Sequence, residues 1–444
     1  MKKFVSALLV AGLSASILAA CGSGGSGETA EGTGAEGAAP EEETITLRMI
    51  ESLTSPARTE ILAAMIDRFE EANPNIQVEL ISPPFEQADN KIRMMLSAKE
   101  ELDVLEVRDL NVAEMVNNGY IEPLNQYTSQ WADFATLGSV PKSVGSIGEE
   151  LYFVPNGLYQ RQMFYRKDWF DEKGLQPPKT WDELYEVGKQ LTDPAVNRYG
   201  FSFRGGPGAN SNTDAMVLSF NGDNVNLEDS MFTNDGATIF STPEAKSALE
   251  LYLKIYNDIS PKDSINWGFQ EQVQAFTSGV TAMLLQDPDV IQTVTESLPE
   301  GTWATAPMPT GPDGKALIAA GGAGWGIAQH SENKEAAWKL IEFLSSPEEN
   351  TGFSKDFGLV PVHTTATEDE FFQTGPYRTL IDMSNDPNTF VNYKPPFAYP
   401  GTGQWGNVAM ETGQALLLGE ATVDETLAVW DAYWKKEKEA LASK

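Results

Sequence analysis

Cysteine and histidine are scarce in this 444-residue chain, which contains one cysteine and two histidines. A lone cysteine cannot form a disulfide within the chain, and His330 and His363 offer little material for metal sites or for activated nucleophiles. The sequence also has no GxSxG, HExxH or GxxxxGK[ST] motif. We therefore expect no metal and no cofactor. The 64 acidic residues leave open a hydrolase that uses two carboxylates.

Basic residues are also few: 31 lysines and arginines stand against 64 aspartates and glutamates, for a formal net charge of −33. Nucleic-acid binding depends on basic patches that contact phosphates, so this composition argues against a nucleic-acid partner. Acidity of this degree fits solubility in a cation-rich exterior. Long apolar runs are missing after the first 20 residues, so we expect any membrane attachment to be at the N-terminus.

The N-terminus has the pattern of an export signal. Lys2 and Lys3 precede an apolar run that is broken only by small residues and ends in "LAAC". This run is too short for a confident membrane span and is typical of a secretory signal. Its end resembles the lipobox of bacterial lipoproteins, where the thiol receives a diacylglycerol and the peptide is cut before the cysteine. The resemblance implies a signal peptide over 1–20 and a lipid anchor on Cys21, against the alternative of a buried free thiol.

The segment after the cysteine cannot form a core. Residues 22–43 consist mainly of glycine, alanine, serine and threonine, with six glutamates and no lysine or arginine. Such a composition predicts a flexible, self-repelling chain. We expect an acidic linker over 21–43 and a folded body that begins near Thr44.

The first part of the body alternates strand and helix patterns. The segments "ITLRMI" (45–50), "IQVELI" (76–81) and "LDVLEV" (102–107) are typical of strands, and helical spacing separates them. Ser55 before Pro56 predicts an N-cap with proline at the first helical position. This βαβαβ order predicts a parallel sheet covered by helices on both faces.

Polar residues directly follow two of these predicted strands. Ligands of parallel sheets bind at the carboxyl ends of the strands. This rule indicates Glu51 after the first strand, and Arg108 with Asp109 after the third, as candidate ligand contacts. The alternative for each residue is a solvated loop or a helix cap.

Five later segments form a specific pattern when they are taken together in their order along the chain. They are "YFVPNGLYQRQMFYRKDWFDEKGLQPPKTWDELYEVGKQLTDP" (152–194), "FTSGVTAMLLQDPDVI" (276–291), "WATAPMPTGPDGK" (303–315), "GGAGWGIAQHSENKEAAWKLIEFLSSPE" (321–348) and "LLLGEATVDETLAVWDAYW" (416–434). Together they resemble the extracellular solute-binding proteins of carbohydrate ABC importers, the family of the maltodextrin-binding proteins. The resemblance covers nearly all of residues 44–444. Within it, Thr180 and Glu183 also form a predicted capping box.

The resemblance implies an α/β, two-lobed periplasmic-binding-protein-like fold with a hinge and an interlobe ligand cleft. The chain is expected to cross between the lobes near 154–157, 319–322 and 358–362. Lobe 1 is then 44–155 with 321–361, and lobe 2 is 156–320 with 362–444.

Aromatic rings suit the apolar faces of sugars, so exposed tryptophans in loops are candidate contacts. Trp405 lies in a proline- and glycine-rich loop, and the resemblance places it where relatives carry a sugar-stacking tryptophan. Trp325 follows the second crossing, where many relatives also place an aromatic residue, and its alternative is a core position. Helical spacing predicts the core for four other tryptophans: Trp181, Trp338, Trp430 and Trp434.

Four further residues complete the candidate site. Tyr159 falls at a position that relatives use for ligand contact, and Arg161 shares its strand face. Asp287 stands near a position where relatives have tryptophan, which favours a hydroxyl acceptor over a stacking ring there. Arg204, in the glycine-rich "RGGPGANSN", could bind either a hydroxyl pair or a uronate carboxylate.

The resemblance implies a lipid-anchored, monomeric binding protein at the extracellular face of the cell membrane. It captures a sugar or oligosaccharide and delivers it to the transmembrane subunits of an ABC permease. Two alternatives remain: a binding protein for another polar solute such as a sugar acid, and a secreted glycan hydrolase.

Overall fold

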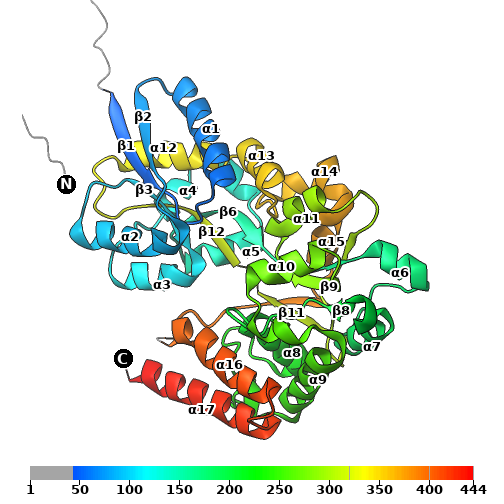
Figure 1. Ribbon diagram of the computed structural model, residues 1–444. Helices are drawn as coiled ribbons and strands as arrows, with labels where there is room; N and C mark the ends of the chain where they lie inside the picture. The colour runs from blue at the N-terminus through cyan, green and yellow to red at the C-terminus, as the bar shows by residue number, and fades with distance from the viewer. Residues whose placement is uncertain (1–43, 320, 400, 444) are drawn as a thin grey trace, which may run out of the picture. The chain divides into compact units, whose positions relative to one another are not determined.

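The computed structural model describes residues 44–319, 321–399 and 401–443 as mixed helices and strands (Figure 1). The predicted signal peptide, the acidic linker and Cys21 lie outside these described residues. The strands are β1 (Ile45–Ile50), β2 (Ile76–Ile81), β3 (Val104–Arg108), β4 (Ser146–Ile147), β5 (Glu150–Leu151), β6 (Val154–Tyr159), β7 (Gln162–Tyr165), β8 (Tyr199–Phe201), β9 (Thr281–Gln286), β10 (Ala304–Ala306), β11 (Ala316–Ala319), β12 (Gly321–Ile327) and β13 (Phe390–Tyr393).

The helices are α1 (Pro56–Ala72), α2 (Phe85–Ala98), α3 (Asp109–Asn117), α4 (Asn125–Thr128), α5 (Ser139–Val144), α6 (Lys167–Lys173), α7 (Trp181–Leu191), α8 (Asn210–Asn221), α9 (Pro243–Ile259), α10 (Phe269–Thr277), α11 (Ile291–Ser297), α12 (Lys334–Leu344), α13 (Pro347–Phe357), α14 (Glu370–Gln373), α15 (Gly375–Ser384), α16 (Thr402–Leu417) and α17 (Val423–Ala442). None of the described helices has both the length and the apolar character needed to cross a membrane.

The first sheet contains five strands in the order β2-β1-β3-β12-β6. β1 pairs in parallel with β2 and with β3, as the alternation of strand and helix predicts. β12 runs antiparallel to both of its neighbours, β3 and β6. The prediction of a parallel sheet therefore holds for β1, β2 and β3 only. β12 comes from much later in the chain and enters the sheet in the opposite direction.

Helices cover both faces of this sheet (Figure 1), because successive strand residues point to opposite sides. Met49 packs into the core under α1 and α12, whereas its neighbour Ile50 packs into the core under α2 and α3. The first core includes Leu47, Leu62, Phe69, Val104, Ile327, Trp338 and Phe353. The second core includes Ile92, Met95, Leu105, Val107, Val112 and Met115.

Local capping sets the helix boundaries as predicted, with one difference. The Ser55 side chain accepts a hydrogen bond from the backbone N–H of Arg58, and Pro56 is the first residue of α1. The Thr180 hydroxyl likewise accepts from the backbone N–H of Glu183 at 3.1 Å. The Glu183 carboxylate, however, accepts from the N–H of Lys179 at 2.7 Å. The reciprocal bond of the predicted capping box thus goes to the residue before the cap.

The second sheet contains four strands in the order β10-β7-β9-β8. β7 is antiparallel to β10 and β9, and β8 is parallel to β9. One large core joins this sheet to α7, α8, α9, α16 and α17. Three of the four tryptophans predicted to be core residues lie in it, and the fourth, on α12, packs into the first core: Trp181, Trp430, Trp434 and Trp338.

The chain passes between the two sheets at short links. β6 ends in the first sheet at Tyr159 and β7 begins in the second sheet at Gln162, a few residues after the predicted boundary at 155. β12 opens the first sheet at Gly321, directly after the β11 segment that pairs with β13. In the third segment Val360 exchanges backbone hydrogen bonds of 3.0 and 3.3 Å with Leu158. The exact lobe boundaries stay a prediction.

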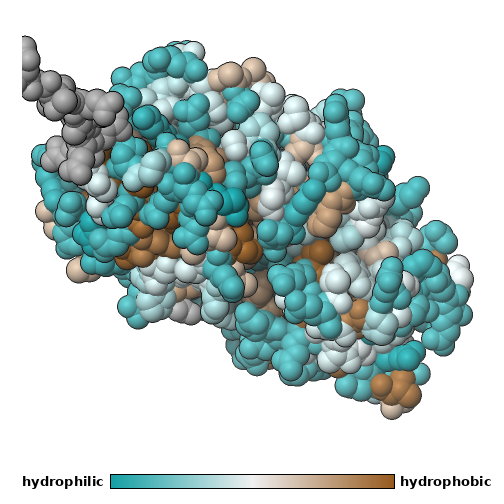
Figure 2. All heavy atoms as spheres, turned by 90° about the horizontal axis from the view of Figure 1, so that it is seen from above, coloured by the Kyte–Doolittle hydropathy of each residue, from teal (hydrophilic) through white to brown (hydrophobic). Residues whose placement is uncertain are grey.

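The face of the molecule drawn in Figure 2 is mainly hydrophilic, and its apolar side chains form separate patches. This distribution agrees with a chain that carries 64 acidic residues. The tight packing of apolar side chains is instead found in the three interior cores.

Candidate ligand-binding site

A cavity of about 1060 Å³ has walls from two groups of elements. The first group is the five-stranded sheet with its helices, and the second is the four-stranded sheet with its helices and the β11–β13 pair. One wall comes from the length of α3, from Asp109 to Asn117, from Tyr159 at the end of β6 and from Gly321 at the start of β12. The other wall comes from the first turns of α8 and α16, from β11, and from residues 393–399. A volume of this size is in the range of small-molecule sites. The cavity therefore lies where segments far apart in the sequence converge.

Five of the nine residues that the sequence indicates as ligand contacts line this cavity, and four do not. The lining residues are Asp109, Tyr159, Arg161, Asp287 and Trp405. The others, which lie outside the lining, are Glu51, Arg108, Arg204 and Trp325.

Trp405 lies at the cavity wall and also inside an aromatic cluster. Its residue is 3% exposed, and its ring centroid lies 5.3 Å from that of Phe240 and 5.4 Å from that of Trp434. Its ring also contacts Trp430 and Tyr433, at 5.6 and 5.5 Å between centroids. An open stacking platform would be far more exposed, so this ring serves at least in part to pack the aromatic cluster.

The indole N–H of Trp405 donates to Oδ2 of Asp214 at 2.9 Å. Asn210 donates to the same oxygen at 3.2 Å. Burial raises the pKa of Asp214 to about 7, and these two hydrogen bonds oppose the shift. Asp214 and Tyr393 both line the cavity, and the nearby carboxylate contributes to the raised pKa of Tyr393, which burial dominates.

Arg161 and Asp287 form the charged centre of the second wall. Arg161 donates from Nη1 to the Ser211 carbonyl at 3.1 Å and to Asn212 Oδ1 at 2.9 Å, and from Nη2 to the Leu285 carbonyl at 2.8 Å. Burial raises the pKa of Asp287, and the positive charge of Arg161 opposes that shift. These bonds direct the arginine donors to protein acceptors, and the Asp287 carboxylate can accept hydrogen bonds from a ligand.

Asp109 ties the start of α3 to β12. Its Oδ1 accepts from the Leu110 N–H at 2.6 Å and its Oδ2 from the Gly322 N–H at 2.8 Å. Burial raises the pKa of Asp109 to about 6, against these two bonds. The carboxylate therefore serves as a local cap and also faces the cavity. Tyr159 faces the same space from the end of β6, and burial raises the pKa of its hydroxyl.

Arg204 and Arg108 make contacts within the protein. Arg204 Nε donates to the Pro207 carbonyl at 2.7 Å, and its guanidinium lies against Gly208, where a Cβ would be 2.3 Å from Nη2. Arg108 Nη1 pairs with Asp89 at 2.9 Å. Both arginines therefore have protein partners beside the site, and a ligand contact by either one stays a prediction.

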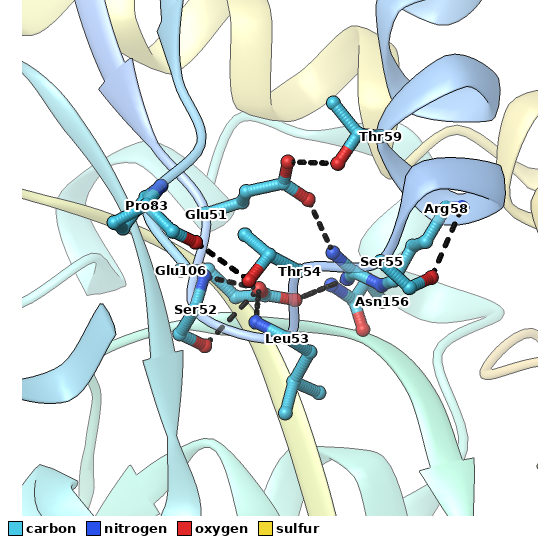
Figure 3. Close-up of polar contacts among 10 residues, drawn as sticks. All are labelled: Glu51, Ser52, Leu53, Thr54, Ser55, Arg58, Thr59, Pro83, Glu106 and Asn156. Atoms are coloured by element: carbon cyan, nitrogen blue, oxygen red, sulfur yellow. Dashed lines mark hydrogen bonds and ion pairs between the residues drawn. The ribbon is translucent and has the colours of Figure 1, made fainter. Parts of the chain in front are cut away.

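Glu51 and Trp325 lie in the interior around the first sheet, and Figure 3 shows Glu51 with its partners. Glu51 is fully buried and accepts hydrogen bonds from Arg58 at 3.0 Å and from Thr59 at 2.5 Å. Trp325 is 1% exposed in the core under α1, and its ring lies 5.9 Å from the Arg58 guanidinium carbon. Both side chains therefore lie outside the cavity lining, and a ligand contact by either one stays a prediction. A strand end predicts the Glu51 position but not the buried arginine that occupies its carboxylate.

Sequence reasoning missed Asp214 and Tyr393. The glycine-rich segment "RGGPGANSN" precedes Asp214, and α8 begins within it at Asn210. The signal in the sequence is that Asp214 stands directly before the apolar "AMVL". Most of α8 after its first turn is buried, and an acidic residue in a buried helix indicates a polar partner or a binding role. No comparable signal marks Tyr393, since among the described strands its strand β13 pairs with β11, about 70 residues earlier in the sequence.

Comparisons with known proteins agree with this arrangement. A protein of Brucella abortus (strain 2308) that is named as a binding protein is 25% identical over 384 residues, 83% of this chain and 88% of that protein. The mannitol-binding protein of Pseudomonas aeruginosa is 27% identical over 222 residues, 48% of this chain and 49% of that protein. The solved structure of T. maritima MalE3 with bound maltose has a TM-score of 0.74 and 21% identity, and the match covers 88% of this chain and 99% of that one.

The structural likeness confirms the predicted two-lobed periplasmic-binding-protein fold. The model of the family described as bacterial extracellular solute-binding protein matches residues 55–351, which is more than half of the sequence. The chain therefore belongs to the bacterial extracellular solute-binding protein family.

Proposed function

We propose that this protein is the solute-binding component of an ABC importer and that it captures a sugar or a polyol. The observation that carries the proposal is the cavity of about 1060 Å³, whose walls come from both groups of elements. A ligand in such a cavity contacts both walls at once, so it stabilises the form in which they are closest. The family match and the mannitol-binding relative support the same function.

The lining has the chemistry that a polyhydroxy ligand requires. Carboxylates and tyrosine hydroxyls supply hydrogen-bond partners: Asp109, Tyr159, Asp214, Asp287 and Tyr393. Apolar side chains supply surface for C–H groups: Met231, Met308, Leu317, Ile318 and the edge of Trp405. This mixture of a few polar groups on a mainly apolar wall is typical of specific small-molecule sites.

A ligand screen tests the proposal. Melting temperatures are measured with D-mannitol, ribitol, D-glucose, maltose and maltotriose, because a ligand at 100 times its Kd stabilises the folded state by about 2.7 kcal/mol. We expect at least one of them to raise the melting temperature without being consumed. Small-angle scattering with that compound should then show a smaller radius of gyration, with a non-binding compound as the control. If no compound stabilises the protein, the proposed function is wrong. Consumption of the stabilising compound would favour the hydrolase alternative.

We propose in addition that Cys21 carries a lipid anchor that holds a monomeric receptor at the outer face of the membrane, where it meets its permease. The support is the "LAAC" motif after an export-type apolar run. Two fatty chains would give stable attachment, whereas one gives only marginal binding. The acidic segment 22–43 would let the receptor reorient toward the permease.

A further inference from the structure

Asp214 has one carboxylate oxygen that is held by the protein and one that is not. Its Oδ2 accepts hydrogen bonds from Trp405 and Asn210. Its Oδ1 is buried and has no hydrogen-bond partner among the described residues. The residue is 8% exposed and lines the cavity. A buried acceptor without a partner is unfavourable for folding, which indicates that this oxygen has a partner in a ligand-bound state.

The charged side chains of the cavity leave an excess of negative charge. Four carboxylates and two guanidinium groups line it: Asp109, Glu114, Asp214, Asp287, Arg93 and Arg161. Arg93 pairs with Glu114 at 3.0 Å, and Arg161 acts electrostatically on Asp287. Asp109 and Asp214 form no ion pair with any of the described residues. The charge of Arg108, which pairs with Asp89, acts on Asp109, whereas no cation among the described residues acts on Asp214. Asp214 is therefore the lining carboxylate that is left without a balancing cation.

We infer that Asp214 binds a ligand hydroxyl through Oδ1, that Trp405 and Asn210 position this carboxylate, and that the site selects uncharged polyhydroxy ligands over sugar acids. The inference rests on the proposed function and narrows its substrate class. An ionised carboxylate only accepts hydrogen bonds, and a sugar or polyol hydroxyl donates them. A hydrogen bond to a charged acceptor is also stronger than one between neutral groups.

The arginines near the site do not offset this selection. Arg161 directs both of its Nη atoms to protein acceptors, the Ser211 and Leu285 carbonyls and the Asn212 side chain. Arg204, which the sequence left as a possible uronate contact, lies outside the lining, and its charge acts on Asp287 together with that of Arg161. The carboxylate of a sugar acid would thus enter a space with unbalanced negative charge and like charges would repel it.

Titration calorimetry at pH 8 tests the selection on the full-length wild-type protein. The probes are three neutral compounds and the acids that correspond to them: D-mannitol with D-mannonate, D-glucose with D-glucuronate, and maltose with maltobionate. We expect the neutral compound that binds best to have a Kd at least 100-fold lower than that of its acid. An acid that binds as tightly as its neutral partner would overturn the inference and leave the proposed solute-binding function standing. Absence of binding by every neutral compound would overturn the proposed function and the inference with it.

Two variants test the proposed roles of Asp214 and Trp405 in ligand binding. Asp214→Asn keeps the shape but removes the charge, and we expect it to weaken the binding of the best neutral compound at least tenfold. Asp182→Asn is the matched control. Asp182 is exposed in the first turn of α7, so this variant should leave the Kd unchanged. A Kd for Asp214→Asn within twofold of wild type would contradict a direct contact.

Trp405→Phe removes the indole donor but keeps an aromatic ring in the cluster. We expect a several-fold weaker Kd, and we expect the double variant with Asp214→Asn to bind no more weakly than Asp214→Asn alone. This non-additivity is the signature of a residue that acts through its partner. Additive losses would overturn the positioning role and assign Trp405 a contact of its own.

Discussion

Glu106 on β3 anchors a buried polar network whose loss should be costly (Figure 3). Its Oε2 accepts hydrogen bonds from the Ser52 N–H at 2.8 Å, the Ser52 hydroxyl at 3.1 Å and the Leu53 N–H at 3.0 Å. Its Oε1 accepts from Asn156 at 2.7 Å and from the Arg58 guanidinium. Arg58 and Glu106 are both fully buried. The network joins β1, α1 and β3 to Asn156 on β6, the strand that leads to the first crossing.

Glu106→Gln keeps the shape of this side chain but removes its charge. A glutamine has one acceptor oxygen, so in either orientation its NH₂ group faces at least two donors that lose their acceptor. Each unsatisfied buried donor costs about 1–3 kcal/mol, and breaking a buried ion pair from one side costs about 3–5 kcal/mol. These figures describe the same loss, and Arg58 keeps its bond to Glu51 at 3.0 Å. We expect the free energy of unfolding to fall by about 3–5 kcal/mol.

Glu79→Gln is the matched control. Glu79 pairs with Arg48 at 3.2 Å, but its side chain is 57% exposed. Exposed ion pairs contribute about 0–1 kcal/mol, so this change should be nearly neutral. Urea denaturation followed by circular dichroism measures both variants, with the slopes compared to confirm a similar change in exposed surface. A loss below about 1 kcal/mol for Glu106→Gln would refute the argument.

The pH dependence gives a second measure of the same network. Burial opposes ionisation of Glu106, but the charge of Arg58 and the hydrogen bonds from Leu53, Ser52 and Asn156 hold its pKa below the ordinary value. A carboxylate with a lowered pKa stabilises the fold above its unfolded pKa of about 4.5, and the stabilisation is lost as pH falls through the folded pKa. The difference between wild type and Glu106→Gln should therefore be constant near neutral pH and shrink below about pH 4.

Three further predictions follow from the same structure. Because burial raises the pKa of Asp214 to about 7 from 3.8, its ionisation destabilises the ligand-free fold as pH rises through this window. Asp214→Asn should then raise ligand-free stability by about 1–3 kcal/mol at pH 8, with the gain vanishing toward pH 4 in thermal melts; equal stability at pH 8 would contradict it. A Cβ at Gly324 would lie 2.0 Å from the Val154 carbonyl oxygen, whereas one at Gly352 has nothing within 4 Å. In chemical denaturation Gly324→Ala should cost about 3 kcal/mol or more, and the helical control Gly352→Ala should be neutral or slightly stabilising; similar effects at both positions would count against the β12–β6 packing. Cys21→Ala should move the protein from the membrane fraction to the detergent-free supernatant, and retention in the membrane would exclude the proposed anchor.

Much of the local structure could be predicted because its causes lie within a few residues. The periodicity of "ITLRMI" and "IQVELI" gives the bounds of β1 and β2, and Ser55 with Pro56 gives the start of α1. The third predicted strand began two residues too early, because the apolar pattern of 102–107 continues back beyond the paired residues that start at Val104. Helix capping and strand alternation are short-range effects, so a short window of sequence contains most of the information they need.

The candidate site could be predicted only in part. Five of its nine proposed residues line the cavity, but the sequence did not separate Trp405 at the wall from Trp325 in the core. Both are apolar residues beside glycines, and the local pattern shows that such a ring is buried without showing what buries it. Trp325 is covered because β12 places it on the α1 face of the first sheet, beside Arg58.

The sequence alone determined the fold class, the order of the first strands and helices, and the family to which the chain belongs. Tertiary structure alone decided which polar groups are free to bind a ligand. Glu51 accepts a hydrogen bond from Arg58, seven residues away. Asp214 accepts one from Trp405, 191 residues away, and its other oxygen has no partner among the described residues. The physical reason is that a carboxylate is available only if no donor satisfies it, and the donors that decide this arrive through chain reversals that no local pattern encodes.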